Sequence, residues 1–218
     1  MKTFDNATFQ AALIHELKNH LGLLGMTLEQ LQPTGEVEHD TTLDAARLLC
    51  QSVTDRLHQA LWLFRSNQGP LVLNVDAYSP HDLVQTLAAR ARALARDHFS
   101  IKIDLCPDLQ PIAFFDRDLV EMAMINAVQN SLAYAKTRIE LFARSRDGWL
   151  ELGVRDDSEG YPTEIIQNLA NDNPYVARGT GLGLQFSKLI AQLHENQGRL
   201  GDLSLGNAHG SVFTLRLP

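Results

Sequence analysis

The sequence of 218 residues has few cysteines, few aromatic residues and no long apolar run. Its two cysteines, Cys50 and Cys106, are too few for a disulfide framework or a zinc site, so we expect reduced, buried thiols. The apolar runs, such as residues 60–64 and 71–73, fall well short of the roughly 20 residues that span a bilayer. Residues 1–10 lack the apolar core of a secretory signal. These absences predict a cytoplasmic protein that does not enter the membrane.

Basic residues are in the minority, because 19 lysines and arginines stand against 26 acidic residues, for a net charge of −7. A nucleic-acid-binding protein needs a basic patch or stripe, so we expect no nucleic-acid partner. Hydrophobic residues make up 44% of the chain, which excludes wholesale disorder. A chain of this length forms one medium domain or two small ones.

Apolar residues recur at alternating spacings of three and four in residues 1–66, which is typical of long packed helices. One series comprises Ile14, Leu17, Leu21, Leu24, Leu28 and Leu31, and a second comprises Leu43, Ala46, Cys50, Val53, Leu57, Ala60 and Phe64. The turn signal Pro33-Thr34-Gly35 separates them, so we predict a helical hairpin. Its single apolar face favours dimerisation into a four-helix bundle. Packing of the hairpin on the rest of its own chain remains the alternative.

A linker at residues 67–70 separates this hairpin from a second domain, residues 71–218. There the pattern predicts helices at 79–96, 116–135 and 182–193, and strands at 71–75, 99–105, 112–115, 137–143, 149–155, 199–205 and 211–217. Consecutive strands suggest antiparallel pairing. The predicted class is therefore α+β rather than a doubly wound parallel sheet.

Three segments of this second domain carry side chains suited to a nucleotide. Residues 179–184 (GTGLGL) lead into a helix, where backbone amides can bind an anion, but they match neither a Walker A loop nor a dinucleotide fingerprint. Asn126 and Asn130 share one helical face, and their amides can ligate a hard cation or bind phosphate. Asp156 follows a strand, where a carboxylate can accept from an exocyclic base amine. Each segment alone also fits an ordinary surface or turn.

A fourth segment, His15-Glu16-Leu17-Lys18-Asn19, lies on the first predicted helix. His15 falls one residue past the apolar seam, so we expect it to be exposed, with Glu16 able to orient its imidazole. Asn19 lies on the same face as His15. The segment resembles the zincin motif, but its second histidine is one residue too far along, so we reject a zinc site.

The order of these segments resembles that of the cytoplasmic core of two-component sensor histidine kinases over nearly the whole chain. Residues 15–19 look like the H box, 126–131 like the N box, 156–160 like the G1 box and 179–184 like the G2 box. The resemblance implies a dimerisation and phosphotransfer hairpin. It also implies an α/β-sandwich ATP-binding domain of the GHKL type, shared with type II topoisomerases and heat-shock chaperones.

Carried over residue by residue, the resemblance implies that His15 is the phosphoacceptor and Glu16 the base at its other ring nitrogen. Asn130 is expected to hold Mg²⁺, with Asn126 beside the nucleotide and metal. Asp156 is expected to bind the adenine amine.

The same resemblance implies that Gly160 permits close backbone approach to the base. The edge around the phosphates would comprise Gly179, Thr180, Gly181, Leu182 and Gly183. The implied reaction is phosphoryl transfer from ATP to imidazole, then to an aspartate of a response regulator. Asn19, four residues after His15, implies an added phosphatase activity toward that regulator. A homodimer is implied, and a separate sensor protein is a possible further partner.

Several residues depart from the family pattern. Ser158 stands where a glycine is usual, His20 where a proline is usual, and Ser131–Tyr134 lack the usual basic residue. The segment 163–178 is short for an ATP lid and has no phenylalanine. A phosphotransferase or phosphatase adaptor with a vestigial nucleotide site is therefore an alternative, and an ATPase or protein kinase of the same nucleotide fold is a third.

Overall fold

A computed structural model describes residues 71–95, 98–171 and 182–218 without further gaps. Within the N-terminal part it describes residues 16–17, 19–20, 22–24, 26–27, 46, 49, 53, 55–56, 58–60, 62–63 and 66, all of them helical. Two compact units make up the chain: Met1–Gly69 with Val176–Leu182, and Pro70–Tyr175 with Gly183–Pro218. Among the described residues, no helix combines the length and apolarity that a membrane crossing requires.

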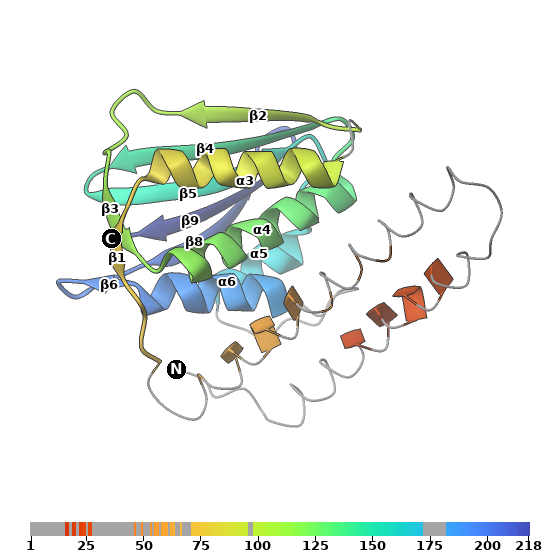
Figure 1. Ribbon diagram of the computed structural model, residues 1–218, viewed down its shortest axis with the longest axis horizontal. Helices are drawn as coiled ribbons and strands as arrows, with labels where there is room; N and C mark the ends of the chain where they lie inside the picture. Colours follow the sequence, from red (N-terminus) through yellow and green to blue (C-terminus); the bar gives the residue numbers. More distant parts are fainter. Residues whose placement is uncertain are drawn as a thin grey trace. The chain divides into compact units, whose positions relative to one another are not determined.

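The second unit is built on a five-stranded mixed sheet in the order β2-β4-β5-β9-β8 (Figure 1). The strands are β2 (Ser100–Leu105), β4 (Arg138–Arg146), β5 (Trp149–Asp156), β8 (Asp202–Asn207) and β9 (Ser211–Leu217). Strands β2 and β4 pair in parallel, and the other neighbours pair antiparallel. The α+β class is thus confirmed, whereas the parallel pair was not foreseen.

Three helices cover one face of this sheet: α3 (Pro80–Ala95), α4 (Arg117–Tyr134) and α6 (Leu182–Leu193) (Figure 1). A short helix, α5 (Thr163–Ala170), was not predicted. The core between helices and sheet is closed by side chains with less than 2% exposure, including Leu83, Leu87, Met124, Ile139, Leu141, Leu152, Phe213 and Leu215. Burial of these alternate strand positions explains why the period-two pattern predicted most strands correctly.

Asp116 fixes the start of α4. Its Oδ1 accepts from the Leu119 backbone N–H at 3.2 Å, and its own N–H donates to Nε2 of His194 at 2.9 Å. His194 donates from Nδ1 to the Ile190 carbonyl at 2.7 Å. Burial lowers the pKa of His194, although that hydrogen bond and the Asp116 charge act in the opposite sense. A neutral histidine thus joins the end of α6 to the beginning of α4, and the two helices run antiparallel.

Two strand predictions were wrong in their bounds. Residues 71–75 form no strand, and the pairing segment lies just after them, with β1 (Asp76–Tyr78) antiparallel to β3 (Ala113–Phe115). The predicted strand 199–205 divides into β7 (Arg199–Leu200), which pairs with β6 (Glu195–Asn196), and β8. The break falls at Gly201, where a Cβ would lie 2.3 Å from the Ala191 carbonyl oxygen.

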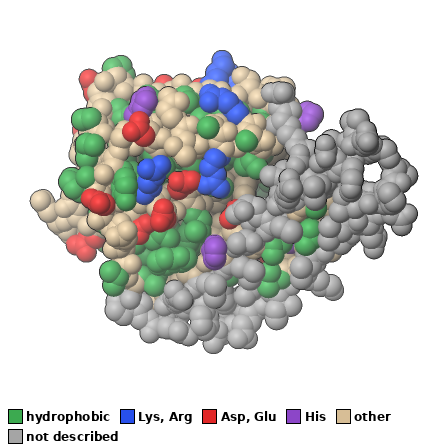
Figure 2. All heavy atoms as spheres, viewed as in Figure 1, with side chains coloured by type: hydrophobic (Ala, Val, Ile, Leu, Met, Phe, Trp, Pro, Cys, Tyr) green, Lys and Arg blue, Asp and Glu red, His purple; other side chains and the backbone are tan. Residues whose placement is uncertain are grey.

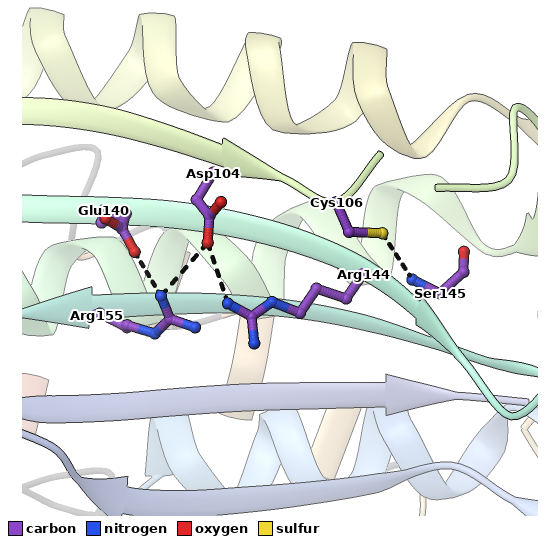
Figure 3. Close-up of polar contacts among 6 residues, drawn as sticks. All are labelled: Asp104, Cys106, Glu140, Arg144, Ser145 and Arg155. Atoms are coloured by element: carbon purple, nitrogen blue, oxygen red, sulfur yellow. Dashed lines mark hydrogen bonds and ion pairs between the residues drawn. The ribbon is translucent and has the colours of Figure 1, made fainter. Parts of the chain in front are cut away.

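Charged side chains cover the sheet face turned away from the helices (Figure 3). Arg155 Nη1 lies 2.6 Å from Glu140 Oε1 and 3.5 Å from Asp104 Oδ2, and Arg144 Nη2 lies 3.1 Å from the same Asp104 oxygen. Both guanidinium groups also stack on Phe142, with the Arg155 carbon 4.4 Å from the ring centre. This face is therefore closed by paired charges.

Cys106, directly after β2, is free and half-buried rather than buried as predicted, and its sulfur accepts from the Ser145 N–H at 3.4 Å (Figure 3). Cys50 lies outside the described residues. On the face shown in Figure 2, basic and acidic side chains are interspersed. An ion pair joins Arg90 of α3 to Glu121 of α4.

Candidate functional site

Asp156 lies at the end of β5 in the centre of the candidate site and is 7% exposed. Its Oδ1 accepts from the backbone N–H groups of Ser158 at 3.0 Å and Ser211 at 3.2 Å. Its Oδ2 accepts from the hydroxyls of Ser131 at 2.7 Å and Ser211 at 2.6 Å. Burial disfavours the charged form, but the hydrogen bonds from these serines outweigh it and hold the pKa of Asp156 below its usual value. The structure thus holds an ionised carboxylate at a strand end.

The neighbouring Asp157 anchors the loop between α4 and β4. Its Oδ1 accepts from the backbone N–H groups of Lys136, Thr137 and Arg138 at 2.8, 3.0 and 3.2 Å. The small burial of Asp157 is outweighed by these hydrogen bonds and by that of the Thr137 hydroxyl, so its pKa is lowered. Asp157 therefore joins the end of β5 to the beginning of β4.

Asn207, at the end of β8, clamps the loop that follows Asp156. Its Oδ1 accepts from the Tyr161 N–H at 2.8 Å, and its Nδ2 donates to the Tyr161 carbonyl at 2.9 Å. Gly160 has φ +90°, and a Cβ there would lie 2.6 Å from Asn207 Oδ1. The loop needs glycine here for both its backbone conformation and this close approach. Burial raises the pKa of Tyr161 to about 12, so its phenol stays protonated.

Asn126 and Gly183 meet where α4 and α6 cross. Asn126 is fully buried, and a Cβ on Gly183 would lie 2.2 Å from its Oδ1. Asn130 is half-buried one turn further along α4, and Ser131 follows it. The exposed polar face that we considered for the asparagine pair is therefore wrong for Asn126. The structure brings the predicted Asn126 and Gly183 together, and Ser131 links the asparagine helix to Asp156.

The N-terminal unit places Glu16 and Asn19 on helical backbone. Glu16 is 7% exposed, and its Oε1 lies 3.2 Å from Nε of Arg56, forty residues along the chain. Asn19 is exposed, and His20 Nδ1 is hydrogen-bonded to the Glu16 carbonyl at 2.9 Å. The predicted residues His15, Gly179, Thr180 and Gly181 lie outside the described residues, and Leu182, the first residue of α6, is buried.

Four residues that the sequence analysis did not assign contact candidate residues: Ser131, Ser211 and Asn207 within the second unit, and Arg56 within the N-terminal unit. Ser131 closed the segment that resembles the N box and began the stretch that departs from the family pattern, but it was given no role. Ser211 lies 55 residues after its partner Asp156. Asn207, in the same hairpin as Ser211, lies 46 residues after its partner Tyr161. No local spacing marks such a contact. An isolated serine or asparagine becomes interpretable only when the sheet order is known.

Comparison with known proteins bears on this arrangement. Residues 115–218 match the family model described as histidine kinase-, DNA gyrase B- and HSP90-like ATPase. That segment, just under half of the chain, is thus similar to the ATPase domains that this description names. It contains Asn126, Asn130, Asp156 and the glycines of the candidate site, so the match covers the described part of the site in the second unit.

Curated relatives extend the similarity toward the N-terminus. The sensor-like histidine kinase SenX3 of Mycolicibacterium smegmatis is 25% identical over 96% of this chain and 56% of its own length. The sensor protein PhoQ of Escherichia coli K12 is 27% identical over 92% of this chain and 41% of its own length. The chain thus spans about half the length of these relatives. They are distant homologues, and they are sensor kinases.

Solved structures show the same fold. The Acinetobacter baumannii histidine kinase AdeS has a TM-score of 0.65 at 20% identity, covering 93% of this chain and 96% of its own. The histidine kinase ThkA, solved in complex with the response regulator TrrA, has a TM-score of 0.65 at 15% identity, covering 96% of this chain and 60% of its own.

The donor set fits a nucleotide with Mg²⁺. In the described part of the chain no three His, Cys, Asp or Glu side chains gather as a metal cage. Mg²⁺ usually takes few protein oxygens and completes its shell with phosphate oxygens and water. The half-buried amide of Asn130 offers one such oxygen, beside the buried Asn126. A metal here would depend on the phosphates of its nucleotide.

Proposed function

We propose that this protein is a histidine kinase that phosphorylates His15 from ATP and passes the phosphoryl group to an aspartate of a response regulator. The observation that carries the proposal is the ionised, buried Asp156 in the same unit as the contact between Asn126 and Gly183. Similarity to sensor kinases over more than nine-tenths of the chain supports it. The co-structure of ThkA with a response regulator supports a partner of that class.

Each residue has a proposed role in the transfer. Asp156 accepts from the base amine, and Asn126 and Asn130 position the phosphates. Asn130 would hold Mg²⁺, which would supply positive charge to offset the charge of the phosphates. Gly160 allows the loop to approach the base, and residues 179–183 are proposed to bind the phosphates through their backbone amides.

At the acceptor, a ring nitrogen of His15 attacks the γ-phosphorus. The bond between that phosphorus and the bridging oxygen breaks, and ADP leaves with its electron pair. Glu16 takes the proton from the other ring nitrogen, so the phosphorylated ring is neutral. Arg56 Nε lies 3.2 Å from Glu16 Oε1, which holds that carboxylate in place on the helix. We propose that the hairpin that carries both residues dimerises as a four-helix bundle in the cytoplasm.

An adaptor with a vestigial nucleotide site is the second candidate. One observation favours it: all four acceptor positions of Asp156 are filled by protein donors. A base amine has to displace one of them.

Incubation of the full chain with γ-labelled ATP and Mg²⁺ tests the proposal. We expect an acid-labile label that His15→Gln abolishes while nucleotide binding is retained. His58→Gln, at an exposed position of the same unit, is the matched control and should keep the label. Label that arrives only from a phosphorylated regulator would support the adaptor, and free phosphate without phosphoprotein would support a simple ATPase. Either result contradicts the kinase.

Asn19→Ala should slow dephosphorylation of the phosphorylated regulator by roughly tenfold, or about 1.4 kcal/mol of barrier, because the exposed amide is proposed to position the attacking water. Labelling of His15 should stay within twofold of wild type. The two rates are measured separately, with purified phosphoregulator for the first. Equal loss of both activities would rule out a separate phosphatase role for Asn19.

A further inference from the structure

We propose that Ser131 sets the affinity of this site for adenine, because its hydroxyl occupies the acceptor of Asp156 that a base amine needs. The inference rests on the proposed nucleotide binding and adds a specificity-determining residue to it. A carboxylate offers about four lone-pair positions. At Asp156 two are taken by backbone N–H groups and two by hydroxyls.

The four donors differ in how easily they can move away. The N–H groups of Ser158 and Ser211 belong to the loop and strand that frame the carboxylate. The Ser211 hydroxyl belongs to the same residue at the start of β9 whose N–H also donates to Asp156. Ser131 comes instead from the last turns of α4, and its hydroxyl makes one hydrogen bond, 2.7 Å from Asp156 Oδ2.

Ser131 also has a second acceptor within reach. A serine in a helix can turn its hydroxyl to the carbonyl four residues earlier, which here is that of Ala127. Rotation of the Ser131 side chain about one bond therefore moves its hydroxyl hydrogen bond from Asp156 to the helix backbone. This rotation frees one lone pair of Asp156 Oδ2. Ser131 is 3% exposed, so water competes little for either position. The site has a closed state, with Asp156 saturated, and an open state that accepts an amine.

Adenine binding must therefore break a hydrogen bond between a hydroxyl and a buried carboxylate. A base that has an oxygen in place of the exocyclic amine gains nothing from that opening. Removal of the hydroxyl leaves Oδ2 with a vacant position and keeps the Cβ of residue 131. The Ser131→Ala variant should consequently bind adenine nucleotides more tightly without any change for the 6-oxo analogue.

The experiment measures ATP and inosine triphosphate binding to the full chain by calorimetry with Mg²⁺. We expect Ser131→Ala to tighten ATP binding by about three- to tenfold and to leave inosine triphosphate unchanged. Ser187→Ala is the matched control, because Ser187 is also a buried helical serine, but its hydroxyl donates to the Gly183 carbonyl at 2.8 Å. It should leave the ratio of the two affinities unchanged. Ser131→Cys, with a weaker donor, should fall between wild type and Ser131→Ala.

The outcomes separate the two proposals. Weaker ATP binding by Ser131→Ala would mean that the serine oxygen itself accepts the amine, and an unchanged ratio would mean that Ser131 has no part in base selection. Both overturn the inference while nucleotide binding stands. If neither wild type nor any variant binds either nucleotide, the proposed function fails and the inference with it. ATP binding by Ser131→Ala alone would support the inference about Ser131 and contradict the proposed kinase, because the wild type would then bind no nucleotide.

Discussion

Asp156→Asn should reduce ATP affinity at least about 100-fold, or roughly 2.7 kcal/mol, while the protein stays folded. The asparagine oxygen can still meet the N–H groups of Ser158 and Ser211, which are fixed by the backbone. Its NH₂ group then points to the two hydroxyls, which can rotate to accept. The fold therefore tolerates the change. A base amine, however, now meets a donor where the wild type has a carboxylate.

The 6-oxo base of inosine triphosphate provides the complementary measurement. Its carbonyl can accept from the new NH₂ group, so the preference for ATP over inosine triphosphate should fall or reverse in Asp156→Asn. Asp157→Asn is a close control, because the neighbouring carboxylate binds the Lys136–Arg138 loop and should not change base preference. ATP binding at wild-type strength in Asp156→Asn would show that this carboxylate does not contact the base.

The sequence predicted the secondary structure of the second unit well where burial alternates or follows a helical period. Helix α4 and its preceding Asp116 are a clear case, because Asp116 accepts from the Leu119 N–H at 3.2 Å as a helix cap should. Residues 71–75 misled because four of the five are apolar and three of them are consecutive, as in a buried strand. Val72 is 87% exposed, and the Asn74 N–H donates to Asp116 instead of to a strand. The strand that pairs here is β3, which lies about forty residues further along the chain. Local sequence alone therefore does not show which residues pair with it.

The candidate site was only partly predictable for a related reason. Asp156 and Asn126 could be found because a strand end and a four-residue helical spacing are local signals. The donors that hold Asp156 ionised are brought to it by sheet order: β9 lies beside β5 and carries Ser211 to the same end of the sheet. The resemblance to kinases supplied roles for the four motifs, but not the saturation of Asp156 by Ser131. That saturation follows from the contacts of α4 with the strand end.

The hairpin between β8 and β9 offers the strongest test of how the site is held. Gly210 has φ +142°, and a Cβ there would lie 1.9 Å from the Asp156 carbonyl oxygen and 3.0 Å from Asp157 Cα. Both contacts are with backbone, so no side chain can rotate away. We expect Gly210→Ala to lower the free energy of unfolding of this unit by about 2–4 kcal/mol, through backbone strain and loss of packing.

Gly206→Ala is the matched control, because Gly206 lies on β8 in the same hairpin and a Cβ there meets nothing within 4 Å. Its effect should stay within about 1 kcal/mol of wild type. Urea denaturation of both variants measures the difference, and calorimetry with ATP measures its consequence for the site. The methyl group added by Gly210→Ala pushes against the backbone of Asp156. The carboxylate of Asp156 accepts from the N–H of Ser211, the residue that follows Gly210. Loss of ATP binding should therefore accompany the loss of stability, whereas a Gly210→Ala protein as stable as the control would show that the hairpin does not hold Asp156 in place.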